Sequence, residues 1–353
     1  MTRTSFNDLD YLATRLHARR SRMAEDDRLD TLCRNRNLLE LSRTTHPGME
    51  FPVTQDFQRR LVEDMAREIS DCLKHLDGSA QHFVEWLLVR LQLENIKVLL
   101  RGFLNHVPPV ELQPHLIALS GAAALDAAAL MAAKSLEDFI TQLPPEIACR
   151  RLRILAGNRN NIPNLFILES ALDADHLQEL LARTAALPKV EREIVNPMVF
   201  YEANAFEFML VARGRFHFGL SSESLLPLRL RETGVNGKWF IQLLSAPDIS
   251  SMAALGLGII IDVMPSSRRS DGGHGQIDVA AIESLAWKRL LRLANHAFRR
   301  SHLGIGAVAG YFGVRRVEIA NLITLSEGIR LGVDGSETRA RMIARIEMEA
   351  AHV

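Results

Sequence analysis

The strongest constraint on the fold of this chain is a pattern that returns three times. Its fixed point is a glycine, Gly102, Gly214 or Gly328, and successive copies are 112 and 114 residues apart. Each glycine has large apolar residues six and three positions before it and a glutamate nine positions after it. The residues six positions before are Ile96, Phe208 and Leu322, and those three positions before are Leu99, Val211 and Leu325. The glutamates nine positions after are Glu111, Glu223 and Glu337. The interval exceeds the roughly 20–50 residues of a solenoid repeat, so we expect each copy to be a small domain.

The spacing inside each copy predicts a helix, a stop and a second helix. Apolar residues three apart lie on one face of a helix. A glycine after the last periodic residue is the favoured left-handed stop, and an acidic residue in the next first turn complements the helix dipole. In the third copy, Asp334 and Glu337 also have capping-box spacing. Helix–glycine–helix hairpins are common, but agreement on both sides of three glycines favours true repetition.

Helical periodicity also dominates the rest of the chain. It covers residues 8–23, 56–76, 80–102, 172–187, 279–300 and 336–351. No segment alternates apolar and polar residues between turn pairs, so strands are expected to be few. We therefore predict an all-α protein made of three similar helical-bundle modules, at residues 1–115, 116–231 and 232–353. The glycine-rich stretch 268–276 is predicted to be a mobile loop, which either contacts a partner or serves only as a connection.

Composition argues against several classes of partner. Lys+Arg and Asp+Glu both number 42, so no net positive charge attracts nucleic acid. A membrane span needs ~20 predominantly apolar residues. Of the two most apolar runs, 116–133 is interrupted by Asp126 and 252–264 is only about a dozen residues long. No leader peptide opens the chain, and its three cysteines are far apart, which fits a reducing compartment. We expect a cytoplasmic protein, peripheral to a membrane at most, with no direct membrane insertion.

Five segments carry a family resemblance through their order and spacing. The first is Tyr11 and Arg15 with "LHARRSRM", and "NLLELSRTTHPG" (37–48) follows it. Next come "LENIKVLLRG" (93–102), "KSLEDFITQLP" (134–144) and "GYFGVRRVEIANLITLSEGIRLGV" (310–333). Together they resemble the C subunit of A/V-type rotary ATPases, called subunit d in the eukaryotic enzyme. The middle copy departs most, because Glu207 stands where the flanking copies have Asn95 and Asn321.

This resemblance implies a non-catalytic role without a cofactor. The family member is an all-α funnel of three similar modules around a pseudo-threefold axis. It sits on the cytoplasmic face of the membrane rotor ring and holds the tip of the central axle of the soluble ATPase head. In that place it passes torque between head and ring and supports ATP-driven proton or sodium transport.

Five arginines are candidate partner-binding residues. Arg15, Arg19 and Arg22 stand at i, i+4 and i+7 beside an apolar stripe, so one helical face would present all three to an acidic partner. The alternative is a solvated or internally paired helix face. Arg101 and Arg213 precede repeat glycines and are predicted to point toward the funnel, or to stabilise the end of their helices. Asn95 and Asn321 are predicted to be buried hydrogen-bond partners between helices.

Catalytic patterns are weak. The chain contains no G-x-x-x-x-G-K-[ST] phosphate loop, no H-E-x-x-H and no G-x-S-x-G, and "GIGAVAG" (304–310) lacks the spacing of a dinucleotide turn. His274 and Asp271 could form an acid–base or metal pair, but two donors make a poor site. The alternatives that stay open are an all-α enzyme with a cleft-based acid/base site and a helical scaffold for another assembly.

Overall fold

The computed structural model describes residues 6–119, 125–144, 147, 149–157, 164–265, 277–301 and 304–343. In these parts of the chain the regular structure is helical, apart from one isolated β-bridge between Leu257 and Ile261. The predicted all-α class is therefore confirmed. The glycine-rich stretch 268–276, with His274 and Asp271, lies outside the described residues.

The chain divides into two compact units. Unit 1 comprises residues 1–91, 113–121 and 291–353, and unit 2 comprises residues 92–112 and 122–290. Two of the divisions between the units fall inside long helices. The division after residue 91 lies in α5 (Gly78–Leu104), and the division after residue 290 lies in α15 (Val279–Arg300). The three-module organisation predicted from the repeat stays a prediction.

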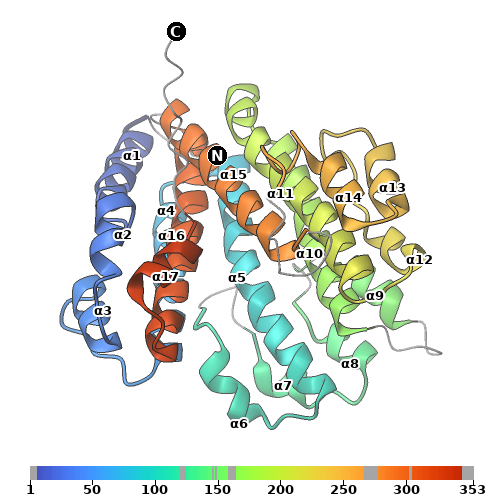
Figure 1. Ribbon diagram of the computed structural model, residues 1–353, viewed down its shortest axis with the longest axis horizontal. Coiled ribbons are helices and arrows are strands. Elements are labelled where there is room, and N and C mark those ends of the chain that lie inside the picture. Colours follow the sequence, from blue (N-terminus) through green and yellow to red (C-terminus); the bar gives the residue numbers. More distant parts are fainter. Residues whose placement is uncertain are drawn as a thin grey trace, which may run out of the picture. The chain divides into compact units, whose positions relative to one another are not determined.

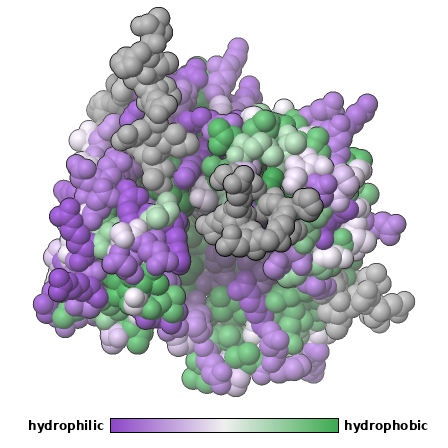
Figure 2. Space-filling view, in the orientation of Figure 1, coloured by the Kyte–Doolittle hydropathy of each residue, from purple (hydrophilic) through white to green (hydrophobic). Residues whose placement is uncertain are grey.

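Unit 1 is built around the long helix α16 (Ile305–Leu331). The other elements are α1 (Phe6–Arg20), α2 (Asp26–Leu32), α3 (Leu38–Thr45), α4 (Thr54–Leu73), η1 (Gln113–His115) and α17 (Gly335–Arg341). Helix α16 packs against α1, α3, α4 and α17, and Figure 1 shows α4 and α16 side by side. Buried residues such as Leu16, Phe57 and Leu61 supply the apolar faces. Hydrophilic side chains predominate on the face over α1 to α3 (Figure 2).

Local hydrogen bonds fix the start of α3 and the end of α1, which lie in two of the family-like segments. Asn37 caps α3, because its side chain accepts a hydrogen bond from the amide of Glu40. Helix α1 ends at Arg20, although periodicity predicted a helix to residue 23. The chain turns there through a hydrogen bond from the amide of Arg22 to the carbonyl of Arg19. Arg22 therefore leaves the helical face that it was predicted to share.

Unit 2 is centred on the antiparallel pair α10 (Leu165–Ala185) and α11 (Lys189–Phe216). Around it lie α6 (Pro109–Leu112), α7 (Ala127–Met131), α8 (Leu136–Thr141), α9 (Arg150–Ala156), α12 (Ser222–Leu225), η3 (Leu226–Leu228), α13 (Lys238–Ser245) and α14 (Ile249–Gly256). Figure 1 shows α10 and α11 next to each other. Ser135 caps α8 by accepting from the amide of Asp138, as the polar start of its segment predicted.

The repeated glycines do not act as the left-handed stops that were predicted. Gly102, Gly214 and Gly328 lie inside α5, α11 and α16, and each helix continues for two or three more residues. The left-handed residues come four or five positions later: His106 (φ 55°), Gly219 (φ 64°) and Gly332 (φ 69°). At two helix ends the repeat glycine carbonyl accepts the long hydrogen bond of a Schellman motif, from Val107 and Val333, each at 2.9 Å. At the end of α11, in the middle copy, the turn is one residue longer, and the amide of Leu220 donates to the carbonyl of Gly214 at 2.8 Å.

The glycines serve close packing instead. A Cβ at each would collide with a side chain of the short helix that follows. The colliding residues are Leu112 of α6, Leu225 of α12 and Thr338 of α17. The three glutamates Glu111, Glu223 and Glu337 stand in the first turns of these short helices, as predicted. The repeat therefore encodes one local arrangement: a long helix, a left-handed turn, and a short helix folded back onto a glycine.

A buried polar residue seven positions before the glycine adds to this arrangement in two copies. Asn321 bonds both backbone groups of Ile343, donating to its oxygen at 3.0 Å and accepting from its nitrogen at 2.8 Å. Glu207 accepts from the amide of Leu230 at 2.7 Å. Asn95 and Asn321 are both buried, as predicted, but Asn321 bonds the segment after α17 and not another helix. In the copies with Asn321 and Glu207, the side chain holds the segment after the short helix.

Candidate functional site

Unit 1 contains a polar cavity of about 650 Å³. Its walls come from the end of α1 and the following turn, α2, the end of α3, one face of α4 and the middle of α16. The lining includes five arginines, four carboxylates, one histidine and one tyrosine, namely Arg19, Arg22, Arg28, Arg67, Arg315, Asp64, Glu68, Asp71, Glu318, His46 and Tyr311. Three of the family-like segments thus meet at one cavity, which we call the polar cavity.

Arg15 and Arg19 are paired inside unit 1. Both donate to Oδ2 of Asp71 on α4, at 3.4 and 3.2 Å. Hydrogen bonds from Lys74 and from Arg19 hold the pKa of Asp71 below its ordinary value, against the opposing effect of its partial burial. These two predicted arginines therefore fasten α1 to α4.

Arg22 and Arg28 stand differently at the edge of the cavity. Both are exposed, and neither side chain forms a hydrogen bond or ion pair with any residue that the structure describes. Their guanidinium groups can bind carboxylates without first breaking an internal contact. Arg22 was among the predicted partner-binding residues, whereas Arg28 was missed because it lies beyond the predicted helical face.

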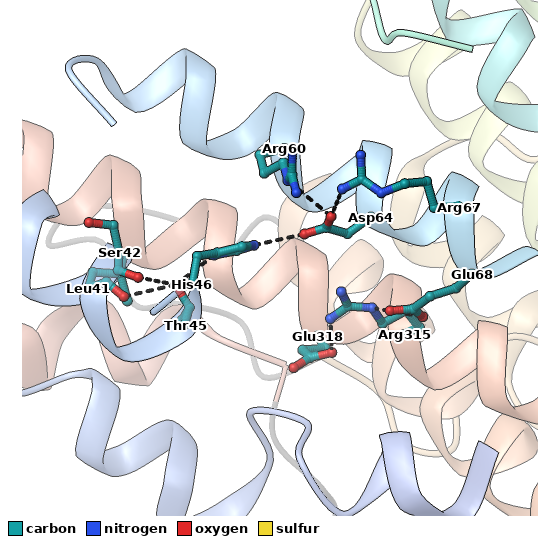
Figure 3. A network of polar contacts seen from close by, with 10 residues as sticks. All are labelled: Leu41, Ser42, Thr45, His46, Arg60, Asp64, Arg67, Glu68, Arg315 and Glu318. Atoms are coloured by element: carbon teal, nitrogen blue, oxygen red, sulfur yellow. Dashed lines mark hydrogen bonds and ion pairs between the residues drawn. The ribbon is translucent and has the colours of Figure 1, made fainter. Parts of the chain in front are cut away.

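His46 and Asp64 form the centre of the network drawn in Figure 3. Nε2 of His46 lies 2.8 Å from Oδ2 of Asp64, and Arg60 and Arg67 contact the other oxygen of the same carboxylate. Burial, reinforced by Arg60, Arg315 and Arg67, lowers the pKa of His46 to about 4. The imidazole is therefore neutral near pH 7. Asp64 therefore pairs with two arginines and with the neutral imidazole at once.

Helix α16 completes the cavity with Tyr311, Arg315 and Glu318. Glu318 accepts from the backbone amide of Ala24 at 2.6 Å and pairs with Arg315. The hydroxyl of Tyr311 donates to Glu68 at 2.8 Å, and burial raises the pKa of this phenol. Each carboxylate of the lining thus faces a cation or a donor. Such an arrangement holds helices in fixed positions and leaves these groups poorly suited to proton transfer.

Arg101 and Arg213 lie outside the polar cavity, in unit 2. Arg101 Nη2 donates to Glu169 on α10 at 2.9 Å, and Arg213 pairs with Glu283 on α15. In unit 1, Glu327 occupies the same place before its glycine and accepts from Gln58 on α4 at 2.7 Å. The partner residues follow the repeat, since Gln58, Glu169 and Glu283 are 111 and 114 residues apart. The residue before each glycine therefore contacts a corresponding residue of another long helix.

The described residues bear on three alternative roles, namely metal binding, thiol chemistry and membrane insertion. Within the residues that the structure describes, no group of three or more His, Cys, Asp or Glu side chains is placed to hold a metal ion. Cys72 and Cys149 are buried thiols, and burial raises the pKa of each to about 12, so neither is an activated nucleophile. Among the described helices, none has the length and apolar character needed to cross a membrane.

The fold and the polar cavity define an all-α protein with a charge-compensated recess in unit 1. The chain belongs to the ATP synthase (C/AC39) subunit family, whose model matches residues 12–341. This match confirms the resemblance found in the sequence. No curated protein matches the chain.

Proposed function

We propose that this chain is a non-catalytic central-stalk adapter of a V/A-type rotary ATPase. In this role it links the central axle subunits of the soluble head to the membrane rotor ring and so supports ATP-driven proton or sodium transport. The observation that carries the proposal is the family match over residues 12–341, joined to the meeting of three family-like segments at the polar cavity. The protein would act at the cytoplasmic face of the membrane.

The polar cavity suits an adapter because its carboxylates are all compensated from within, by cations and hydrogen-bond donors on neighbouring elements. A torque-bearing subunit needs helices that stay in register under load. Arg19, Arg315 and their carboxylate partners link α1, α4 and α16 for this purpose. Arg22 and Arg28 supply unpaired positive charge at the cavity edge for an acidic surface of the axle. A polar contact of this kind favours fast, reversible assembly.

We also propose that three modules, at 1–115, 116–231 and 232–353, form a pseudo-threefold funnel. Support comes from the recurring glycine contacts and from the recurring polar pairs before them. Under this proposal each pair joins one module to the next: Arg101 to Glu169, Arg213 to Glu283, and Glu327 to Gln58. The two predicted arginines Arg101 and Arg213 then stabilise the funnel itself rather than bind the axle.

Size-exclusion co-elution tests the adapter role. The purified chain would be mixed with the axle subunits of its own rotary ATPase and, separately, with the detergent-solubilised rotor ring. We expect a stable complex with each and no ATP turnover by the chain alone. Failure to bind both would contradict the proposal. ATP hydrolysis that co-purifies with the chain would contradict its non-catalytic part.

A further inference from the structure

A second concave surface lies in unit 2 and shares no residue with the polar cavity. It is a groove of about 910 Å³ between α9 and the segment that follows α12. Four arginines line it, Arg150, Arg151, Arg229 and Arg231, together with the aliphatic residues Ile154 and Leu226. We call it the arginine groove.

One wall of the groove is an extended segment fixed by side chains. Residues 227–233 alternate in burial, with Leu228 and Leu230 buried and Arg231 exposed. Four side chains from α9, α10 and α11 hold the segment's backbone. The bonds are Arg151 Nη2 to Arg229 O (2.8 Å), Leu230 N to Glu207 Oε1 (2.7 Å), Arg231 N to Gln178 Oε1 (2.9 Å) and Asn204 Nδ2 to Thr233 O (3.0 Å). The wall is therefore organised before any partner arrives, which lowers the entropy cost of binding.

The positive charge of the groove is largely uncompensated. Asp175 forms an ion pair with Arg151 at 2.7 Å, and Glu179 forms an ion pair with Arg183 at 3.0 Å. The side chains of Arg150, Arg229 and Arg231 form no hydrogen bond or ion pair with the described residues. Asp175 and Glu207 attract Arg150 and Arg229 only at a distance, so three guanidinium groups of the lining are free of a direct carboxylate contact.

Apolar surface accompanies this charge. Ile154 is 67% exposed and Leu226 is 45% exposed, although both are large aliphatic residues. Singly exposed aliphatic residues are ordinary, but two in one concave, arginine-lined surface form an amphipathic site. Protein interfaces commonly combine an apolar centre with arginines at the rim.

We propose that the arginine groove is a docking site for an acidic, amphipathic peptide segment of a partner protein. Carboxylates of the segment pair with Arg150, Arg229 and Arg231, since the planar guanidinium matches a carboxylate in bidentate geometry. An aliphatic side chain of the segment packs on Ile154 and Leu226. Among the described residues, the lining has no aromatic side chain on which a nucleic-acid base could stack, and its concave form suits a peptide better than a flat bilayer.

The test is fluorescence anisotropy with the full chain. The probe is a labelled twelve-residue peptide in which Glu and Leu alternate, and the comparison peptides replace Glu by Gln or Leu by Ser. We expect the probe to bind with a micromolar dissociation constant, and each comparison peptide to bind at least about fivefold more weakly. The double variant Arg229→Gln/Arg231→Gln should weaken binding of the probe about tenfold, and Ile154→Ser about threefold.

The matched control is Arg299→Gln/Arg300→Gln, which removes the same charge from exposed positions on α15. It should bind the probe like the unmodified chain. Unfolding midpoints check that every variant folds, and the Ile154 variant serves if the arginine pair fails to fold. Equal binding by the Arg229/Arg231 variant and the control would overturn the proposal. Tighter binding of a single-stranded oligonucleotide or of phosphatidylglycerol vesicles than of the peptide would overturn it as well.

Discussion

The polar cavity of unit 1 and the arginine groove of unit 2 use the same residue for opposite purposes. In the cavity, Arg19 and Arg315 are paired with carboxylates on neighbouring helices and are partly or largely buried. In the groove, Arg229 and Arg231 are unpaired and accessible. Paired arginines hold helices together, whereas unpaired ones are available to a partner. The surroundings of an arginine therefore decide whether it has a structural or a binding role.

Removing one arginine from each region tests this difference most strongly. Arg315→Met leaves Glu68 and the 5%-exposed Glu318 side chain without their cation. We expect the free energy of unfolding to fall by about 3–5 kcal/mol, because a buried charge loses its partner. Arg231→Met is the matched change in the groove, and we expect less than ~0.5 kcal/mol. Urea unfolding at pH 7 measures both, and similar losses in the two variants would contradict the comparison.

Glu207, which holds one wall of the arginine groove, should make the free energy of unfolding fall as pH rises. Burial raises its pKa to about 7, from an ordinary value near 4.5, so the folded state holds the proton more tightly than the unfolded state. Stability is therefore lost as pH rises through this window, by about 3 kcal/mol in total. Glu207→Gln keeps an oxygen for the Leu230 amide and has no charge to bury.

The variant should accordingly be more stable than the unmodified chain at pH 8 and nearly equal to it at pH 4.5. Urea unfolding at several pH values gives the difference. A difference that stays constant between pH 4.5 and 8 would show that Glu207 does not titrate in this range. Asn321, the neutral counterpart in unit 1, introduces no such dependence.

His46, in the polar cavity, should make the free energy of unfolding fall as pH drops, which is opposite to the effect of Glu207. Its pKa is about 4 in the folded chain against 6.5 ordinarily, so the unfolded state binds more protons between these values. Stability should therefore fall by about 2 kcal/mol as pH drops from 6.5 to 5. His46→Gln retains an amide that can donate to Asp64 and should reduce this loss. A loss of the same size in the variant would assign the acid sensitivity to other groups.

The glycine contacts occur in both units and should respond alike. Gly102→Ala and Gly328→Ala place a methyl group against Leu112 and Thr338, and we expect each to cost about 1–3 kcal/mol through overpacking. Gly157→Ala is the control, because a Cβ there meets no atom of the described residues closer than 3.5 Å and Gly157 is in the right-handed helical region. Thermal unfolding compares the three. A cost confined to one repeat glycine would weaken the argument that the copies are equivalent.

The sequence allowed the helical class and the repeat to be predicted, since both depend on local spacing. The glutamates fall in first turns as predicted because that feature is decided within a few residues. The role of the glycines was mispredicted because α5, α11 and α16 continue past them, supported by packing against the next short helix.

The two sites depend on contacts that local spacing does not reveal. Asp71 is 52 residues from Arg19, so nothing near Arg19 indicated that it would be paired. The groove joins Arg150 to residues some 80 positions later in the chain. One signal was present, the alternation in "PLRLRE" (227–232), which is typical of an extended segment with one buried face.

The central claim is that unpaired arginines at the edge of the polar cavity bind the axle. Isothermal titration calorimetry of the chain with its axle subunits tests it most directly. We predict a dissociation constant of micromolar or tighter, about −8 kcal/mol or better. Arg22→Glu/Arg28→Glu should weaken this at least about tenfold, while Arg299→Glu/Arg300→Glu should not change it. Unchanged affinity in the Arg22/Arg28 variant, with its unfolding midpoint intact, would contradict the claim.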